Sequence, residues 1–545
     1  MRVLLLNLTR FGDLIQSQLC ISGLASQGHE VHLACLENFR AAAGLLDGLS
    51  GVAALPGSRL VAGPGADWRR MLSSFWEWGE EVRRSMAPER VVNITPSLAG
   101  RVLARHFAAV GAFGAASGTS PVEQVGLCLD EEGFSLDTSP WAAFLQTASR
   151  HRGTSPFNVA DIFCRVAGLG AGECPPALRL AGPDAANRAR VDALLAELEA
   201  TVLSGLPETP GKAPGGLVAL QLGASEERRR WPLEYFACLG RLLWEKCAAL
   251  PVLLGGPGEQ RLAERYAAQA DHPHISLVGR TSLPELAAVL TRARLLVTND
   301  TGTMHLAAGL STPVLAVFLC TAQPWDTGPY LEGALCLEPD MDCHPCAFGA
   351  PCARGEACRK AIGPEGVFAA AAACLAGQGW GDAAPCGSRA FVAGRDAWGY
   401  LGLTRLGEHA PDDRQAWLLV QRAFYRQFLD GVDSPDLSGL PPLSGTARAE
   451  LAAPLAEASG LITLLSSQGT LLLRDPLPAF KTKFLASWQR LTARLQADPR
   501  LAPLGWLLAT QGEERGDNLA DILSLIRRFQ AGLAALAGLC ASSAD

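Results

Sequence analysis

The stretch Leu295–Ala308, with the sequence LLVTNDTGTMHLAA, decides the fold. Its apolar start is typical of a strand that is covered on both faces, and its polar centre predicts a turn into a helix. The N-terminus of such a helix offers unpaired N–H groups and a positive dipole end, and Gly302 allows a ligand to approach the backbone, which suits a pyrophosphate. An ordinary helix capped by Asp300 or Thr301 fits the same residues. This stretch alone therefore leaves both interpretations open.

Other apolar runs alternate with helical patterns on both sides of this stretch. The first half contains Val3–Leu6, Glu30–Cys35 and Arg90–Ile94. The second half contains Leu217–Leu222, Pro251–Leu254, Ile275–Val278 and Val314–Phe318, in addition to Leu295–Thr298 at the start of the quoted stretch. This rhythm predicts two doubly wound parallel sheets, whose ligands lie at the carboxyl ends of the strands.

The pattern divides the chain into four segments. We expect a Rossmann-like domain over residues 1–180 and a helix with a Gly/Pro-rich linker over 181–216. A second Rossmann-like domain should cover 217–386 and include a cysteine-rich loop at 343–358. From about Gly387 the rhythm becomes helical, so residues 387–545 are expected to form a helical accessory domain, with apolar stripes such as the one from Phe480 to Leu495 as its core.

Composition excludes several classes of protein. The formal charge of −7 gives no basic excess for a nucleic-acid partner. No run resembles a signal peptide or has the length of a membrane-spanning helix, so a cytoplasmic location is expected. Most of the 16 cysteines stand singly among apolar residues, where they are expected to be reduced and buried. The segment Trp68–Trp78 mixes aromatics with arginines; it predicts either a peripheral membrane contact or, preferably, an amphipathic helix packed on the sheet.

Three more strand ends carry polar residues that chemistry can use. After the first strand, Gly12 makes a turn and Asp13 stands at the start of a helix, where it can be a general base or simply a first-turn acid. A later strand delivers Gly223 and Ser225 to the same edge as the cations Arg229 and Arg230, which can grip phosphate oxygens or belong to a solvated charge run.

The third of these strand ends is a glycine-rich turn. It contains Glu259, whose carboxylate can hydrogen-bond a ribose or a base. A glycine-rich turn alone is weak evidence for a ligand.

The joint order of these motifs resembles one family, the lipopolysaccharide heptosyltransferases of glycosyltransferase family nine. The resemblance covers roughly residues 1–375. The matching segments are Thr9–Leu14, Gly223–Ser225, Arg230–Pro232, Asn299–Ala308, Thr312–Val314 and Pro324–Tyr330. Three features depart from the family pattern: arginine stands where lysine is common before Trp231-Pro232, Thr9–Phe11 replaces the commoner serine-rich approach to Gly12-Asp13, and the helical tail has no counterpart in compact members.

The resemblance implies an inverting enzyme of the GT-B fold, with two Rossmann-like domains that face a cleft. Residues 1–180 would bind the acceptor and residues 217–386 the nucleotide sugar, ADP-heptose or a close relative. Asp13 would be the catalytic base, and catalysis would require no cofactor. The donor would contact Gly12, Gly223, Ser225, Arg229, Arg230, Glu259, Asp300, Thr301, Gly302, Thr303 and His305.

The four thiols of Cys343, Cys346, Cys352 and Cys358 lie within sixteen positions. Such a set predicts a structural zinc or iron site, because four thiolates would occupy all four coordination positions of a tetrahedral metal ion. Reduced, unligated cysteines in a surface loop are the alternative.

Three functions remain open at this point. The first is heptose transfer to the lipopolysaccharide core, at the cytoplasmic face of the inner membrane. The second is heptose transfer to a protein acceptor of the autotransporter or flagellar type, with the tail as the recognition surface. The third is a non-catalytic sugar-nucleotide-binding module, against which the presence of Asp13 argues. An epimerase of the same fold fits these candidate residues less well, because it would need carboxylates and a histidine at the nucleotide, whereas Asp13 is expected on the acceptor side.

Overall fold

The computed structural model describes residues 1–57, 67–109, 122–170, 172–204, 215–381, 384–407, 411–516 and 518–541. Contacts divide the chain into two compact units. The first unit comprises Met1–Thr95, His106–Gln124 and Phe157–His409, and the second comprises Pro96–Arg105, Val125–Pro156 and Ala410–Asp545. Most of the linker expected before residue 217 lies outside the described residues.

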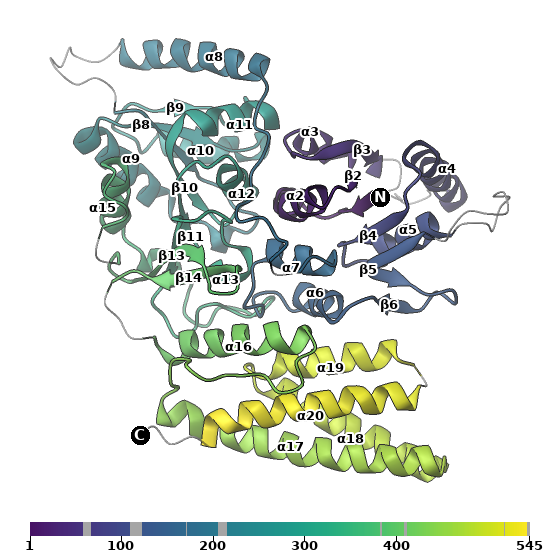
Figure 1. Ribbon diagram of the computed structural model, residues 1–545. Coiled ribbons are helices and arrows are strands. Elements are labelled where there is room, and N and C mark those ends of the chain that lie inside the picture. Colours follow the sequence, from purple (N-terminus) through teal and green to yellow (C-terminus); the bar gives the residue numbers. More distant parts are fainter. Residues whose placement is uncertain are drawn as a thin grey trace. The chain divides into compact units, whose positions relative to one another are not determined.

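The first sheet begins as a parallel Rossmann-like half (Figure 1). Its strands are β1 (Arg2–Leu6), β2 (Glu30–Leu36), β3 (Leu49–Leu55) and β4 (Arg90–Asn93), in the spatial order β3-β2-β1-β4. The order reverses between β1 and β4, and such a switch point opens a crevice at the strands' carboxyl ends. The helices between these strands are α1 (Phe11–Gln16), α2 (Gln18–Ser26), α3 (Arg40–Ala43) and α4 (Trp68–Met86).

The second sheet has the complete dinucleotide-fold order. Its strands β7 (Leu217–Gln221), β8 (Leu250–Leu254), β9 (Ile275–Ser276), β10 (Ala293–Asn299), β11 (Val314–Val317) and β12 (Leu335–Pro339) run β9-β8-β7-β10-β11-β12. All are parallel, and the switch point falls between β7 and β10. The prediction of two doubly wound sheets in a GT-B-type fold is confirmed.

Apolar residues of α9 (Leu233–Cys247) and α15 (Pro364–Leu375) form one buried cluster with the strands of the second sheet. These two helices lie side by side in Figure 1. The remaining helices of the first unit are α7 (Val159–Val166), α8 (Ala185–Leu203), α10 (Gln260–Ala267), α11 (Leu283–Arg292), α12 (Gly302–Gly309), α13 (Pro324–Thr327) and α14 (Cys358–Ala361). Helix α5 (Leu98–Ala108) crosses the boundary between the units.

The helical region begins later than the sequence suggested. Residues after Gly387 form two strands, β13 (Ser388–Arg395) and β14 (Leu401–Arg405), which extend the second sheet antiparallel to β12. Asp161 of α7 anchors this extension: it accepts hydrogen bonds from the Tyr330 hydroxyl (2.7 Å) and the Leu401 backbone N–H (3.0 Å). The apolar alternation of this hairpin was too short to separate it from the helices that follow.

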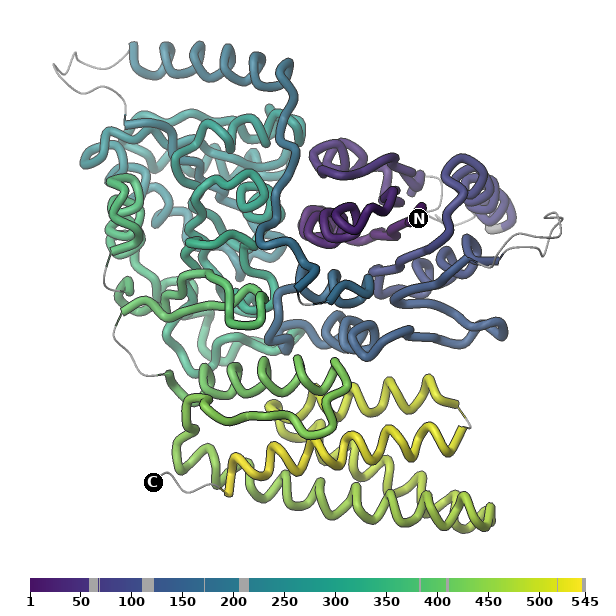
Figure 2. Tube along the Cα trace, in the orientation of Figure 1, coloured from purple at the N-terminus to yellow at the C-terminus, as the bar shows by residue number. Residues whose placement is uncertain are grey.

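The second unit combines two strands with a bundle of helices. β5 (Glu123–Leu129) pairs antiparallel with β6 (Ser135–Asp137), and α6 (Pro140–Arg150) follows. The tail contributes α16 (Asp413–Leu429), α17 (Gly445–Arg474), α18 (Pro478–Ala497), α19 (Ala502–Glu514) and α20 (Leu519–Ala541) (Figure 2). α17 packs against α18 and α20, and α19 packs against α6 and α18. The expected helical extension is confirmed, and it shares its unit with β5, β6 and α6.

Two helices, α20 and α4, bear on membrane contact. By length and composition α20 could cross a membrane, contrary to the expectation from sequence. Its residues Leu523, Ile526, Phe529 and Leu533 are nevertheless buried, as in a core helix. α4 is the amphipathic helix expected from residue 68: Trp78 donates from its indole N–H to the Ala54 carbonyl, while Leu72 and Trp76 are exposed.

The anchor at Asp161 gives a stability prediction. Asp161→Ala leaves two buried donors without their acceptor, so the free energy of unfolding should fall by roughly 3 kcal/mol. Tyr330→Phe removes one hydroxyl and should cost only about 1 kcal/mol. Urea denaturation of both variants measures the difference. Equal small losses would show that Asp161 does not anchor the β13–β14 hairpin.

Candidate functional site

The turn after β1 is built by Asn7. Its side-chain oxygen accepts from the backbone N–H and the hydroxyl of Thr9, and its amide donates to the Asp13 carbonyl (3.2 Å). These bonds fix the chain between the strand and α1. Asp13 therefore stands, partly exposed, in the first turn of a helix at the first switch point.

The starts of α1 and α12 lie against each other. A Cβ at Gly12 would come within 2.9 Å of the His305 ring, and a Cβ at Gly302 within 2.3 Å of Phe11. The amide nitrogen of Gln16 lies 3.3 Å from Nε2 of His305. The structure thus brings the Gly12–Asp13 turn and the Gly302–His305 turn together. The two glycines are needed for this approach, and Phe11 occupies the space that the missing Gly302 side chain leaves.

The side chain of Asn299 organises the second switch point. Fully buried at the end of β10, it donates to the carbonyls of Gln221 (3.3 Å), Leu222 (3.1 Å) and Gly223 (3.1 Å). Its oxygen accepts from the Trp231 backbone N–H (2.8 Å). One amide therefore joins the turn after β7, the arginine-rich segment and the start of α12.

The structure separates the two arginines that the sequence left equivalent. Arg229 is buried; it donates to the Thr321 hydroxyl (2.8 Å) and pairs with Asp300 (3.3 Å), beside the start of α12. Arg230 instead donates to the Ala224 carbonyl. Arg230 also lines a pocket of about 340 Å³, whose other cations are Arg265, Arg359 and Lys360.

Thr301 occupies the N-cap position of α12 and makes no side-chain capping hydrogen bond, so a helix capped by the Thr301 hydroxyl is not what the structure shows. Beside it, the Thr303 hydroxyl donates to Gln221 (3.1 Å), and Ser225 is exposed in the turn after β7. A Cβ at Gly223 would overlap the Glu259 carboxylate, so the Glu259 side chain occupies the space beside Gly223.

Glu259 has local partners. Its carboxylate accepts from the Gly256 backbone N–H (2.8 Å) and from the Gln221 amide (3.3 Å). The residue therefore closes the glycine turn after β8 onto the end of β7.

The thiols of the cysteine loop lie near one another, but as described they are not arranged to coordinate a metal ion. Cys346 donates its backbone N–H to the Cys320 carbonyl (2.7 Å). Burial, with the neighbouring thiols of Cys320, Cys358 and Cys343, raises the pKa of Cys346 to about 11. Among the residues that the structure describes, no three His, Cys, Asp or Glu side chains are placed to hold an ion.

Sequence reasoning did not assign roles to several residues of this site. Asn7, Gln16, Gln221, Asn299 and Thr321 hold the turns in place, as described above. Asn299 ends a buried strand and Asn7 directly follows one, and a buried amide at such a position was the available signal. Cys320 likewise escaped notice, because it is 23 residues before Cys343.

Comparison with known proteins assigns part of the chain to a protein family. Residues 177–355 match the model of glycosyltransferase family 9 (heptosyltransferase). Lipopolysaccharide heptosyltransferase 1 of Pseudomonas aeruginosa is 34% identical over 124 residues, which are 23% of this chain and 34% of that protein. Lipooligosaccharide heptosyltransferase 2 of Haemophilus ducreyi is 36% identical over 89 residues, 16% of this chain and 25% of that protein. Residues 177–355 are therefore a family-nine glycosyltransferase region, and the resemblance is confirmed.

Solved heptosyltransferases give a weaker likeness. The Escherichia coli ADP-heptose lipopolysaccharide heptosyltransferase II aligns with a TM-score of 0.48 at 15% identity, over 69% of this chain and 99% of its own. Heptosyltransferase WaaC of the same organism, solved with ADP, aligns with a TM-score of 0.42 at 17% identity, over 61% and 91%. In sequence, the chain spans about a third of the first curated relative and a quarter of the second.

The environment of His305 gives a pH prediction. Burial lowers its pKa from 6.5 to about 4, so the folded protein holds it neutral where the unfolded chain would protonate it. The stability from neutral His305 is complete above pH 6.5 and is lost as pH falls towards 4, by on the order of 3 kcal/mol. Urea denaturation from pH 7 to 4.5 should show a shallower pH dependence for His305→Gln than for the wild type. An NMR titration of His305 with a midpoint near 6.5 would contradict this.

Proposed function

We propose that the protein is an inverting glycosyltransferase that transfers a heptose from ADP-heptose to an acceptor hydroxyl. One observation carries the proposal: α1 and α12 begin at the two switch points and lie in contact across Gly12 and Gly302. A carboxylate in one first turn and an uncapped helix N-terminus in the other are thereby neighbours. A base and an anion site at close range are what displacement of a nucleoside diphosphate needs.

Asp13 would take the proton of the acceptor hydroxyl as its oxygen attacks the anomeric carbon. Attack from the face opposite the leaving group inverts that carbon. Negative charge then develops on the departing diphosphate. The N–H groups of Gly302 and Thr303 and the guanidinium of Arg229 would stabilise it, so the proposal requires no divalent metal ion.

The remaining expected donor residues take more specific roles in this proposal. Arg229, rather than Arg230, is the phosphate cation, because Arg229 lies beside the start of α12. Asp300 orients Arg229, and Glu259 and Gly223 shape the neighbouring turn. Gly12 and Gly302 permit the close approach of the two helix starts.

The other expected contacts are the Ser225 hydroxyl, the Thr301 backbone and the His305 ring. They would line the donor beside this turn. His305 is neutral there, so it would act as a hydrogen-bonding group rather than as a cation.

We place the reaction in lipopolysaccharide core synthesis, at the cytoplasmic face of the inner membrane. The names of the curated relatives support this choice. A protein acceptor is the second candidate, favoured by the helical tail. Assays of the full chain with a core-oligosaccharide acceptor and with candidate protein acceptors distinguish them. A non-catalytic sugar-nucleotide-binding module would bind the donor and transfer to neither.

Removal of the base tests the mechanism. Asp13→Asn keeps the shape but cannot accept the proton, so kcat should fall by about 10²-fold or more while donor affinity is retained. Initial rates with ADP-heptose, measured with a magnesium chelator present, test both claims. Near-normal turnover of the variant would exclude Asp13 as the base, and wild-type activity that requires added magnesium would contradict the metal-free mechanism.

A structural zinc or iron bound by Cys343, Cys346, Cys352 and Cys358 remains a proposal. Its support is the gathering of the thiols in one loop with Cys320; binding would require these side chains to turn towards a common point.

Elemental analysis of protein purified without a histidine tag should give about one zinc or iron per chain. Replacing Cys352 with serine should lower that content, whereas Cys386→Ser, at an exposed cysteine outside the loop, should not. Metal-free folded protein with four titratable thiols in the loop would show that the cysteines are unligated.

A further inference from the structure

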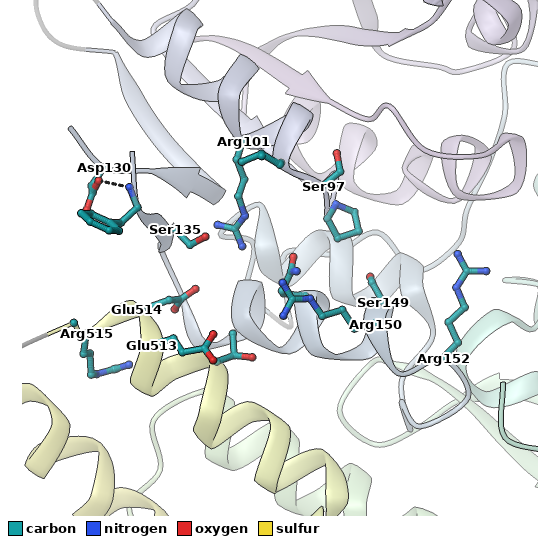
Figure 3. Close-up of a pocket in the computed structure, with 16 residues that line it drawn as sticks. Ser97, Arg101, Asp130, Ser135, Ser149, Arg150, Arg152, Glu513, Glu514 and Arg515 are labelled. Atoms are coloured by element: carbon teal, nitrogen blue, oxygen red, sulfur yellow. Dashed lines mark hydrogen bonds between the residues drawn. The ribbon is translucent and has the colours of Figure 1, made fainter. Parts of the chain in front are cut away.

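The second unit contains a large polar groove that the proposed reaction does not use. Its volume is about 1010 Å³. Its walls are the start of α5, the turn between β5 and β6, the end of α6 and the end of α19 (Figure 3). It lies outside the matched residues 177–355, and the tail supplies one wall, from Thr510 to Gly516.

Arginines and hydroxyl groups dominate the lining. Arg101, Arg150, Arg152 and Arg515 contribute four guanidinium groups, and Ser97, Ser135, Ser149 and Thr510 contribute hydroxyls. Figure 3 shows Arg101 and Arg150 reaching the centre of the groove, with Glu513 and Glu514 on the facing helix. With the Gln146 amide oxygen turned towards it, Arg150 donates from Nε (2.9 Å) and Nη2 (3.1 Å), which orients the guanidinium.

The acidic residues cancel only part of this positive charge. Buried Asp137 pairs with Arg101 at 2.7 Å, and Arg101 also donates to the Cys128 carbonyl. Burial and a hydrogen bond with Asp137 raise the pKa of Glu514 to about 10, so that carboxyl is neutral at pH 7. Asp130 accepts from the backbone N–H groups of its own turn. The protonated Glu514 carboxyl can both donate and accept hydrogen bonds, and it carries no charge.

We propose that this groove binds a saccharide that carries a carboxylate or a phosphate. Arg150 and Arg152 pair with the anionic group, because a guanidinium matches planar oxyanions bidentately. The serine hydroxyls, the Gln146 amide and the Glu514 carboxyl match sugar hydroxyls, which both donate and accept. The volume stands at the upper end of the range for small-molecule sites, so a ligand of more than one sugar fits. The site is separate from donor binding and does not depend on the proposed transfer.

Direct binding by the full chain tests the site. Calorimetry with a uronic-acid disaccharide and with a disaccharide phosphate should show binding of at least one of them, at least tenfold tighter than a neutral disaccharide of the same size. The two arms separate a carboxylate ligand from a phosphate ligand. Failure of both anionic probes to bind, or equal binding of the neutral one, would overturn the proposal, and so would equal binding of an acidic peptide.

Variants of exposed residues connect binding to the groove. Arg150 and Arg152 are exposed, so replacing both with glutamine leaves the packing intact. This double variant should bind the anionic probe at least tenfold more weakly. Arg490→Gln, an exposed arginine of α18 in the same unit but outside the groove, should bind like the wild type. Unchanged affinity in the double variant would place the ligand elsewhere.

Substitutions of Glu514 and Glu513 give an independent test of the charge in the groove. Because its carboxyl is neutral, Glu514→Gln should change the affinity for the anionic probe less than about threefold at pH 7. Glu513→Gln removes an exposed carboxylate from the same helix end and should strengthen binding. A tenfold gain in Glu514→Gln would show an ionised Glu514 and would contradict the neutral, hydrogen-bonding role assigned to this carboxyl in the groove. ADP-heptose affinity, measured in parallel, should be unchanged in all these variants.

Discussion

The side-chain amide of Asn299 holds the second switch point together. Parallel strands end with unpaired carbonyls, and here the carbonyl of the last β7 residue and the two that follow it accept from one buried amide at the end of β10. The same side chain takes the backbone N–H of Trp231, so the arginine-rich segment is fixed to the same point. Buried polar groups must be paired, and this one amide meets that requirement for four backbone groups. The positions of Gly223, Arg229 and the start of α12 all follow from it.

Glycines then determine how closely the two Rossmann-like halves approach. At Gly12 and Gly302 a single methyl group would collide with His305 or Phe11, so the two helix starts can touch only where no side chain intervenes. Close packing also removes water from His305, which explains its depressed pKa. The same contact therefore shapes the candidate site and sets the charge of a ring within it.

Charge is handled differently in the two units. Near α12, Arg229 is neutralised by Asp300 and held by Thr321, so its position is fixed before any ligand arrives. In the groove of the second unit, Arg101 is paired in the same way, whereas Arg150 and Arg152 are exposed, and the proton held by Glu514 lowers the negative charge of the lining. Fixed cations suit a reacting diphosphate, whereas exposed cations suit reversible binding of an anion.

The sequence by itself determined the strand and helix pattern, because continuous apolar runs and glycine turns are local signals. It therefore placed β1, β2, β4, β7, β8, β10 and β11, and it identified Asp13 and the Thr298–His305 turn as strand-end groups. Only the tertiary structure decided which groups meet. Arg229 and Arg230 are adjacent in sequence and equal in chemistry, yet backbone direction sends one to Asp300 and the other to a separate pocket. The residues that β13, β14 and the tail contact lie hundreds of positions away in the sequence. A local sequence pattern therefore could not predict these contacts.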